Sequence, residues 1–237
     1  MSTMVSPSRH DVHRMFDRIS PRYDLLNRLL SLGLDRAWRR RAVAELPRDT
    51  ETPVLDLACG TGDVALAAAA AHAQRRVIGI DMAERMLTLA TTKAAAQGWS
   101  DRIQFLRGDG HALPLPDESV GAVTIAFGIR NMADLDVCLG EMRRVLRRGG
   151  KAIILEFSLP QNRLLRRLHL FYIRRIVPVV GRTVSGDSYA YAYLNQTIET
   201  FPYGTAFCEL MARAGFTAPQ ARPLNGGIVT LYTGQKP

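Results

Sequence analysis

Apolar runs of strand length alternate with longer stretches of helical period from about residue 53 onward. The runs that predict strands span 53–58, 76–81, 103–108, 120–127 and 151–157, and the stretches that predict helices span 62–73, 83–97 and 134–147. Such alternation is typical of βαβ units, in which successive strands lie parallel in one sheet and helices cover it. The pattern therefore predicts an α/β fold with a mostly parallel sheet and helices on both faces.

Glycine pairs mark two boundaries in this pattern. Gly149 and Gly150 follow the predicted helix 134–147, and glycines are common at helix C-termini. Further on, the predicted elements are a helix over 203–214 and two strand-like runs, 216–222 and 227–234, with Gly226 and Gly227 between them. Because two glycines between strands favour a hairpin-like reversal, we predict a seven-stranded sheet that ends in a hairpin.

Two segments do not follow the repeating pattern. Residues 9–48 read as a helical extension before the first strand, and residues 159–200 form a long insertion between the fifth strand and the last helix. At 237 residues the chain is shorter than the length at which cores usually divide. We therefore predict one domain over 1–237 that carries both additions, which are the usual place for substrate recognition.

The segment VLDLACGTGD, residues 54–63, reads as an apolar strand that ends in a glycine-rich turn at the start of a helix. Gly60 and Gly62 lack a Cβ atom, so the turn can adopt positive φ angles and let a ligand approach the main chain. Asp81 ends the next predicted strand and places a carboxylate at the same sheet edge, where a ribose would lie. The turn therefore predicts a nucleotide-type ligand.

Two classes of nucleotide-binding enzyme fit that turn. Gly60, Gly62 and Ala65 satisfy the loose pattern of dinucleotide-dependent dehydrogenases. Against that class stand Asp56, inside the first strand, and Asp109, at the end of the third. With ACGTG, these acids resemble class I S-adenosylmethionine (SAM) dependent methyltransferases, which have a Rossmann-like fold with a seven-stranded sheet. The resemblance implies SAM as cofactor, held by Asp56, Gly60, Thr61, Gly62, Asp81, Met82, Asp109, Gly110 and Ala126.

Each part of SAM requires a different partner. Backbone N–H groups of the turn would bind the carboxylate, Asp56 the ammonium group and Asp81 the two ribose hydroxyls. Asp109 and the N–H of Gly110 would contact the edge of the adenine. A single aspartate at a strand end is more often a helix cap or a solvated turn residue, but three at successive strand ends favour a binding site.

Further segments resemble one family of these methyltransferases. YDLLNRLLSLGLDRAW (23–38) and RVLRRGGKAIILEFS (144–158) are similar to the two signature segments of the ubiquinone/menaquinone biosynthesis C-methyltransferase family (UbiE/MenG). FGIRN (127–131) is similar to the family's motif after the fourth strand, and YAYLNQTIETFP (191–202) also resembles the family. The resemblance implies transfer of a methyl group from SAM to a ring carbon of a polyprenylated quinol.

Carbon methylation needs a base and a group that favours a phenolate, because a neutral ring carbon is a poor nucleophile. Arg130 stays cationic and is the candidate that stabilises the oxyanion, although a surface salt bridge is the alternative role for it. Asn131 would hold a water or a quinol oxygen. His111 is either a base or a polar loop residue. The residues expected to line the quinol pocket are Tyr23, Asp24, Asn27, Tyr191 and Tyr193.

The motifs leave the acceptor ring open. The compact chain favours demethylmenaquinol, and the benzoquinol intermediate of ubiquinone biosynthesis is the alternative. The formal net charge of +9 also suggests a nucleic-acid methyltransferase. The chain lacks the Pro-Pro-aromatic motif and the Pro-Cys pair of two such classes, so no nucleic-acid partner is expected. A non-catalytic SAM-binding scaffold is disfavoured by FGIRN, and no histidine or cysteine spacing predicts a metal.

The positive charge gathers in two windows. Residues 159–182 contain six arginines and no acid, and residues 35–48 contain five arginines and two acids. No run approaches the roughly 18 apolar residues that span a bilayer, and the N-terminus lacks the apolar segment of a secretory signal. We therefore expect a cytoplasmic protein that binds peripherally to the inner face of the membrane, where a polyprenylated acceptor resides, and the oligomeric state stays open.

The stretch 161–177 offers a means of membrane contact. At 100° per residue, one face carries Leu164, Leu165, Leu168, Phe171, Tyr172 and Ile176, and the opposite side carries Arg163, Arg166, Arg167 and Arg174. Pro178 is expected to end this helix. A basic amphipathic helix suits anionic lipid headgroups, and the alternative is a helix that packs its apolar face on its own sheet.

Overall fold

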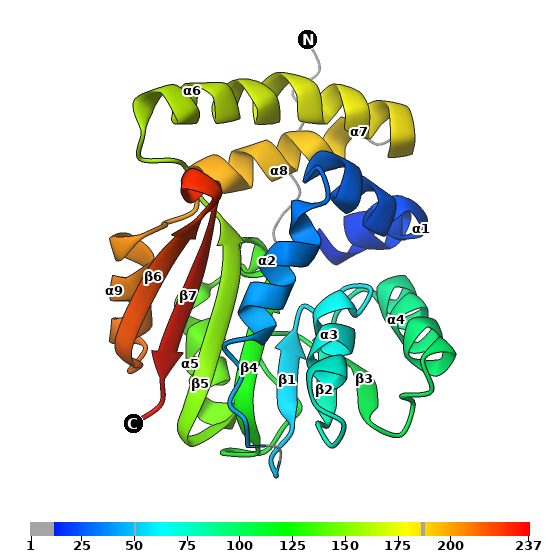
Figure 1. Ribbon diagram of the computed structural model, residues 1–237, viewed down its shortest axis with the longest axis vertical. Coiled ribbons are helices and arrows are strands. Elements are labelled where there is room, and N and C mark those ends of the chain that lie inside the picture. Colours follow the sequence, from blue (N-terminus) through cyan, green and yellow to red (C-terminus); the bar gives the residue numbers. More distant parts are fainter. Residues whose placement is uncertain (1–11, 50, 186–187) are drawn as a thin grey trace.

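The computed structural model describes residues 12–49, 51–185 and 188–237. Seven strands form one sheet in the order β3-β2-β1-β4-β5-β7-β6 (Figure 1). The strands are β1 (Val54–Leu57), β2 (Val77–Asp81), β3 (Ile103–Arg107), β4 (Val120–Ala126), β5 (Leu146–Phe157), β6 (Thr217–Leu224) and β7 (Val229–Gln235). The five strands from β1 to β5 pair in parallel, and β7 is antiparallel to both β5 and β6. The predicted mostly parallel sheet and its C-terminal hairpin are confirmed.

The order of the strands creates a crevice beside β1. From β1 the chain continues to β2 and β3 on one side, and it returns to β4 and β5 on the other. The connections therefore leave the carboxyl ends of β1 and β4 in opposite directions. In open α/β sheets, ligands bind in the gap that such a reversal leaves.

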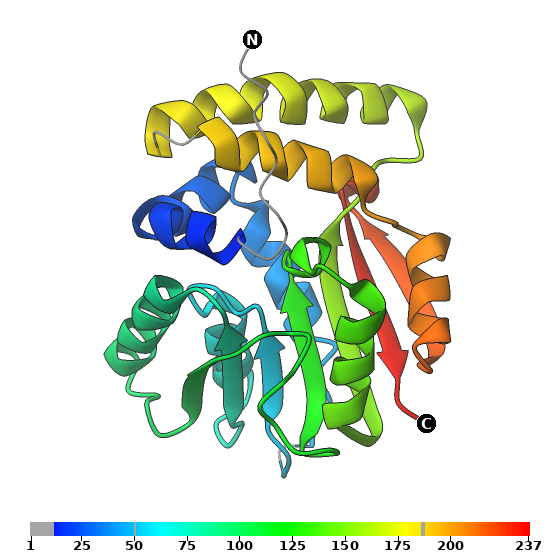
Figure 2. The same ribbon diagram turned by 180° about the vertical axis from the view of Figure 1, so that it is seen from behind.

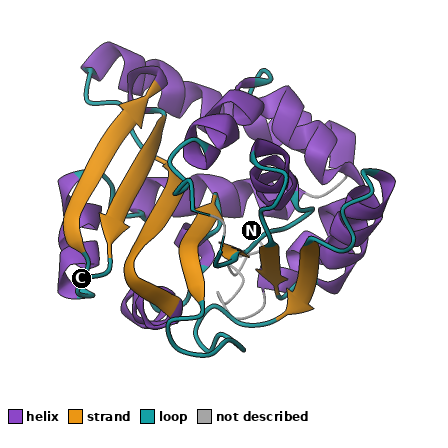
Figure 3. Ribbon diagram, turned by 60° about the horizontal axis from the view of Figure 1, so that its bottom comes forward, coloured by secondary structure: helices purple, strands orange, loops and turns teal. Residues whose placement is uncertain are grey.

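Helices cover both faces of the sheet, as Figures 2 and 3 show. One face packs against α2 (Leu34–Val43), α3 (Asp63–Ala71) and α4 (Glu84–Ala96), and the other packs against α5 (Leu135–Val145) and α9 (Thr205–Arg213). Ala65, Ala68 and Ala69 are fully buried in α3, because small side chains let this helix lie close to the strands. Cys138, Met142 and Phe207 fill the opposite layer.

Helix α5 ends earlier than the sequence predicted. We expected Gly149 and Gly150 to terminate a helix over 134–147, but α5 ends at Val145 and the glycines lie within β5. The register between β4 and β5 shifts after the Val120–Leu146 pair. Gly149 has a φ of 72°, and a Cβ on Gly150 would come within 2.8 Å of the Arg147 carbonyl oxygen. The two glycines therefore allow the irregular backbone at the start of β5, and they do not terminate a helix.

Helix α1 of the N-terminal extension and the helices of the insertion pack together as a separate layer over the carboxyl ends of the parallel strands (Figure 1). The extension contains α1 (Val12–Leu30), and the insertion contains α6 (Arg163–Phe171), a π-helical segment (Tyr172–Ile176), α7 (Val177–Ser185) and α8 (Ser188–Thr200). Their apolar side chains form a third cluster, in which Met15 and Ile19 of α1 meet Ile173 and Tyr193.

Prolines inside two of these helices are tolerated for identifiable reasons. Pro21 of α1 has no N–H for the carbonyl of Asp17, and the Ser20 hydroxyl donates to that carbonyl instead at 2.9 Å. Pro178 does not end the helix as expected. It lies in the first turn of α7, directly after the π-helical segment, where the regular i→i−4 ladder is already interrupted. The helix from Arg163 therefore continues to Ser185.

Candidate active site

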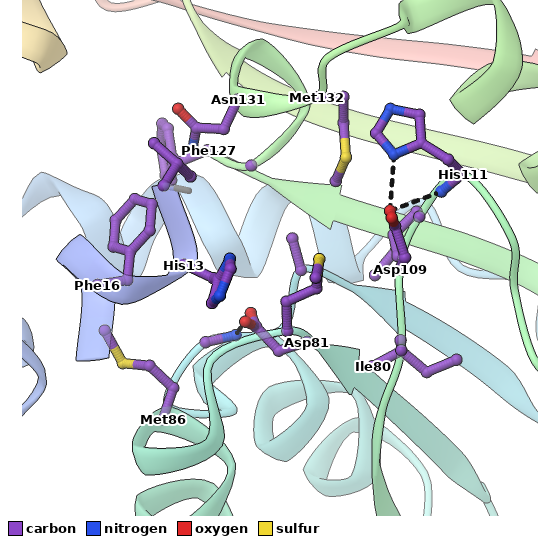
Figure 4. Close-up of a pocket in the computed structure, with 18 of the residues that line it drawn as sticks. His13, Phe16, Ile80, Asp81, Met86, Asp109, His111, Phe127, Asn131 and Met132 are labelled. Atoms are coloured by element: carbon purple, nitrogen blue, oxygen red, sulfur yellow. Dashed lines mark hydrogen bonds and ion pairs between the residues drawn. The ribbon is translucent and has the colours of Figure 1, made fainter. Parts of the chain in front are cut away.

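A cavity of about 190 Å³ lies at the carboxyl ends of β1, β2, β3 and β4, beneath α1. Figure 4 shows His13 and Phe16 of α1 on one side of it and Asp109 and Met132 on the other. Six of the nine residues expected to hold SAM line this cavity, namely Gly60, Asp81, Met82, Asp109, Gly110 and Ala126. The topology therefore brings together residues that come from four different strand ends.

Asp81, at the end of β2, holds the glycine turn that follows β1. Its Oδ2 accepts the Gly60 N–H at 2.8 Å, and its Oδ1 accepts the Ala83 N–H at 2.8 Å. Burial raises the pKa of this carboxyl, and the backbone hydrogen bonds oppose that rise. Carboxylate oxygens have further lone pairs beyond one hydrogen bond each, so Asp81 is able to accept two ribose hydroxyls at the cavity wall.

The other three expected cofactor residues do not line the cavity. Asp56 lies within β1, where its oxygens accept the Ala65 N–H at 3.0 Å and the Thr124 hydroxyl at 2.8 Å. Gly62 directly precedes α3 and has a φ of 81°, and a Cβ there would meet Ala90 and Phe105 at 3.0 Å. Gly62 therefore has no side chain because α4 and β3 pack closely against it. Asp56 stabilises the start of α3 through its hydrogen bond with Ala65.

Thr61 and Asp24 form part of a polar link between α1 and the glycine turn. The Thr61 hydroxyl donates to Asp24 at 2.6 Å, and Lys93 of α4 contacts Asp24 at 2.5 Å and Asp63 at 2.8 Å. Asp24, which we expected at the quinol pocket, lines neither this cavity nor the second one described below. These residues connect α1, α3 and α4.

Asp56→Asn is expected to remove a pH-dependent part of the stability. Burial raises the pKa of Asp56 from 3.8 to about 7. Because the folded protein holds this proton more tightly than the unfolded chain, the stabilisation is complete below pH 3.8 and is lost as the pH rises through 7. The wild type should lose about 2 kcal/mol from this group between about pH 5 and 7.

Asparagine can keep both contacts, since its amide oxygen accepts from Ala65 and its amide nitrogen donates to Thr124. The free energy of unfolding of both proteins is measured in urea across this pH range without SAM. The difference should grow in favour of Asp56→Asn as the pH rises. A constant difference would show that Asp56 is already ionised in the folded protein.

His111 positions Asp109 and has no lone pair left for proton abstraction. Its Nδ1 contacts Asp109 Oδ1 at 2.6 Å, and its Nε2 accepts the Asp134 N–H at 3.1 Å. The second bond places the ring proton on Nδ1, which donates to Asp109. Asp109 also accepts the backbone N–H of His111 at 3.0 Å. Of the two roles open to His111, that of a polar loop residue is therefore the one that the contacts favour.

A second cavity, of about 350 Å³, lies between α1, α2, α6 and α8. Its wall is mainly apolar and includes Leu26, Trp38, Phe157 and Ile173. Three of the five residues expected at the quinol pocket line it, namely Tyr23, Asn27 and Tyr193, and Asp24 does not. The fifth, Tyr191, belongs to α8, but its side chain lies outside the described residues.

The two cavities share three aromatic residues, Phe16, Tyr23 and Phe127. Phe127 follows β4 with a φ of 58°, and Ala58 follows β1 with a φ of 50°. Residues other than glycine seldom adopt this left-handed region, and such strain gathers at functional sites. The left-handed turn after β4 is what places Phe127 against both cavities. Burial raises the pKa of Tyr23, so its phenol stays protonated as a hydrogen-bond donor.

Arg130 and Asn131 occupy the short 3-10 turn after β4, and each lines a different cavity. Asn131 lines the first, and Arg130 lines the second. Arg130 is not at the surface: its Nη1 donates to Glu156 at 2.8 Å, and Glu156 is fully buried. Among the described residues, Arg130 Nε and Asn131 Oδ1 are buried without a hydrogen-bond partner. Unpaired buried polar atoms are costly, so both point to a ligand.

Sequence reasoning missed several residues of the site. Glu156 interrupts the apolar run of β5, and a charge within a buried strand was a signal that a partner must exist. His169 of α6 lines the second cavity, and burial lowers its pKa, but an isolated histidine gave no signal. Phe16 and Trp38 gave none either, because aromatic residues in helices usually belong to a core.

The residues around the first cavity fit SAM. They supply a carboxylate for a diol, main-chain groups of a glycine turn, and the apolar side chains Ile80, Met82 and Met86 for the adenine. No group of three or more potential metal ligands occurs in the described parts of the chain. Fold and site together define a class I SAM-dependent methyltransferase.

Comparisons with known proteins agree. The model of the ubiE/COQ5 methyltransferase family matches residues 3–236, and the chain belongs to this family. It is a SAM-dependent C-methyltransferase. The ubiquinone/menaquinone biosynthesis C-methyltransferase UbiE of Syntrophotalea carbinolica is 47% identical over 94% of this chain and 93% of that protein. The demethylmenaquinone methyltransferase of Thermus thermophilus is 44% identical over 94% of this chain and 100% of that protein.

Solved structures share the fold at low sequence identity. A SAM-dependent methyltransferase from Thermotoga maritima superposes with a TM-score of 0.65 at 20% identity, covering 94% of this chain and 99% of that one. A SAM-dependent methyltransferase from Aquifex aeolicus superposes with a TM-score of 0.60 at 16% identity, covering 83% of this chain and 88% of that one. These likenesses concern the fold and carry no information on the acceptor.

Proposed function

We propose that this protein methylates a ring carbon of a polyprenylated quinol, with demethylmenaquinol as the preferred acceptor. The observation that carries the proposal is the pair of cavities with a common aromatic wall. The first holds the residues suited to SAM, and the second is larger and mainly apolar. Relatives from Bacteroides fragilis, 42% identical, and Thermus thermophilus are named demethylmenaquinone methyltransferases.

The shared wall determines where the two reactants meet. SAM supplies a methyl group on a positively charged sulfur. For an in-line transfer the ring carbon must lie within about 3–3.5 Å of that methyl group, which requires the ring to lie beside Phe16, Tyr23 and Phe127. Aromatic side chains offer flat apolar faces to such a ring. The prenyl tail would then occupy the apolar cavity between α1, α2 and α6.

Arg130 and Asn131 are the residues proposed to promote the chemistry. Arg130 Nε, a buried donor, stabilises the phenolate oxygen that makes the ring carbon nucleophilic. Glu156 and the ring of Phe157, 5.3 Å from the guanidinium carbon, hold the guanidinium in place. Asn131 Oδ1 accepts from a quinol hydroxyl or from the water that takes up a proton. Arg130 stays protonated and is not itself the base.

The proposed acceptor also implies work at a membrane surface. A polyprenylated quinol resides in the bilayer, and none of the described helices is long and apolar enough to cross one. We therefore infer that the protein binds the membrane peripherally. The basic, partly apolar helix from Arg163 is part of the contact, since Leu164, Leu168 and Phe171 are exposed.

A second candidate acceptor is the benzoquinol intermediate of ubiquinone biosynthesis. It is favoured by the relative from Syntrophotalea carbinolica, whose name covers both quinones. A smaller ring would fit the same aromatic wall, and both rings carry the hydroxyl that Arg130 would contact.

Methyl transfer from labelled SAM separates the candidates. Demethylmenaquinol and the benzoquinol, each with a short prenyl tail and kept reduced, are supplied to the purified protein, and total RNA serves as control. We expect a carbon-bound methyl group on the naphthoquinol, identified by mass spectrometry, and no labelled RNA. Methylation of the benzoquinol alone would establish the second candidate. Methylation of neither ring would contradict the proposal.

A further inference from the structure

The exposed large apolar side chains are concentrated on two segments that are far apart in the sequence. Within the described parts of the chain, ten such side chains are exposed, and only Val137 of α5 lies outside these segments. The α1–α2 region contributes Leu25, Leu29, Leu32 and Leu34, and the region from α6 to α7 contributes Leu164, Leu168, Phe171, Ile176 and Val179. Exposed apolar side chains that gather in this way usually mark an interaction surface.

The two segments lie side by side. The Tyr172 hydroxyl donates to the Leu30 carbonyl at 2.9 Å. Beneath it, Ile173 and Val177 pack in one cluster with Met15 and Ile19 of α1. Both views of the ribbon place α6 and α7 along the outer edge of the molecule, on the side of the strands' carboxyl ends (Figures 1 and 2). We call the nine side chains of these segments the apolar rim.

Part of the apolar rim lies at the second cavity. Leu32, Leu34 and Leu168 are exposed to 81%, 37% and 58%, and all three also line that cavity. Leu165 and Tyr172, which we expected on the apolar face of this helix, are half-buried and line the cavity as well. The π-helical segment shifts the helix by part of a turn, so its buried side carries His169, Ile173 and Val177. The helix therefore buries one side and still exposes leucines to solvent.

The charges beside the apolar rim identify its partner. Arg163, Arg167 and Arg175 are exposed, alternate with the rim residues of the helix, and make no ion pair with any described residue. Arginine side chains can lay their apolar stems along a membrane surface while the guanidinium meets lipid phosphates. A second copy of this chain would present the same positive charge and would repel it. Apolar side chains interleaved with arginines instead match an anionic bilayer.

We infer that the apolar rim lies in the surface of an anionic lipid bilayer, with the entrance of the second cavity inside the contact. The α1–α2 leucines, and not the α6 helix alone, then belong to the membrane-binding face. A prenylated acceptor would pass from the bilayer into the cavity without crossing water. This route rests on the proposed function, whereas the binding of the rim to lipid does not.

Vesicle sedimentation tests the inference without any turnover. The probes are vesicles of phosphatidylcholine with and without phosphatidylglycerol. The wild type should bind the phosphatidylglycerol vesicles at least about tenfold more strongly, because each arginine near an anionic surface contributes roughly a factor of five. Leu29→Ser/Leu164→Ser/Phe171→Ser should lose about tenfold in binding, and Arg163→Gln/Arg167→Gln/Arg175→Gln should lose the preference for phosphatidylglycerol. None of these six residues lines either cavity.

Val137→Ser is the matched control, because Val137 is exposed to 44% on α5, away from the apolar rim. It should bind vesicles like the wild type. Methyl transfer to an acceptor with a short tail should be unchanged in the triple serine variant, and transfer to a long-tailed acceptor held in vesicles should fall about tenfold with its binding.

Three results would overturn the inference. The wild type could fail to bind either kind of vesicle, or the triple serine variant could bind as well as the wild type. Sedimentation velocity could also show a dimer that the serine variant loses, in which case a second copy covers the rim. Failure of methyl transfer with intact vesicle binding would instead count against the proposed function alone.

Discussion

Arg130→Ala is expected to reduce methyl transfer by a factor of about 100 to 1,000 and to destabilise the protein. The rate effect follows from the loss of a fixed donor to the developing oxyanion. The stability effect follows from Glu156, which is fully buried and would lose its partner. Removal of one member of a buried ion pair usually costs about 3–5 kcal/mol. SAM affinity should change less than about twofold, because Arg130 lines the second cavity and not the first.

Two further variants separate catalysis from folding. Arg130→Met/Glu156→Gln removes both charges and fills a similar volume, so its stability should approach that of the wild type while methyl transfer stays low. Arg130→Lys keeps the charge but lacks the Nε–H group that is the proposed donor to the phenolate, and an intermediate rate is expected. Rates are measured with labelled SAM and unfolding with urea. Turnover within about twofold of wild type in the folded double variant would show that Arg130 has only a structural role.

Asp81→Ala is expected to weaken SAM binding by about 100-fold or more. The carboxylate is the proposed acceptor for two ribose hydroxyls, and hydrogen bonds to a charged group contribute roughly 1.5–3 kcal/mol each. The same side chain also holds the Gly60 N–H at 2.8 Å, so the glycine turn would lose its fixed conformation. Isothermal titration calorimetry with S-adenosylhomocysteine measures the change without turnover.

Asp81→Asn and Asp101→Asn complete the test. Asparagine at position 81 keeps one acceptor oxygen for the turn and loses the charge, so its affinity should lie between those of wild type and Asp81→Ala. Asp101 is exposed in the turn before β3, and its replacement should leave the affinity unchanged. An affinity of Asp81→Ala within about threefold of wild type would place the ribose elsewhere in the cavity.

Most of the fold could be predicted from local patterns in the sequence. Strand and helix periods predicted the sheet and its C-terminal hairpin, because apolar alternation reports burial directly. They placed the ends of two helices wrongly. Gly149 and Gly150 belong to an irregular strand start, and Pro178 lies in the first turn of α7. A glycine pair or a proline permits several local structures, and the neighbouring strand or the π-helical segment decides which one forms.

The cofactor site shows the same division. The motifs predicted nine residues that hold SAM, and six of them line the first cavity. Asp56, Thr61 and Gly62 belong to the same motif but support the turn from behind. A sequence motif does not distinguish the residues that touch a ligand from those that hold the residues touching it, because both kinds are near one another in the chain.

The sequence by itself determined the α/β sheet, the glycine turn with Asp81 and Asp109 at neighbouring strand ends, and the family. These features depend on local periodicity and on contiguous motifs. Only the tertiary structure decided that Glu156 pairs with Arg130, that Phe127 separates two cavities, and that leucines of α1–α2 join those of α6 in one face. The pairing of β4 with β5 brings Glu156 to the turn that carries Phe127 and Arg130, and the packing of the N-terminal extension against the insertion brings the two sets of leucines together.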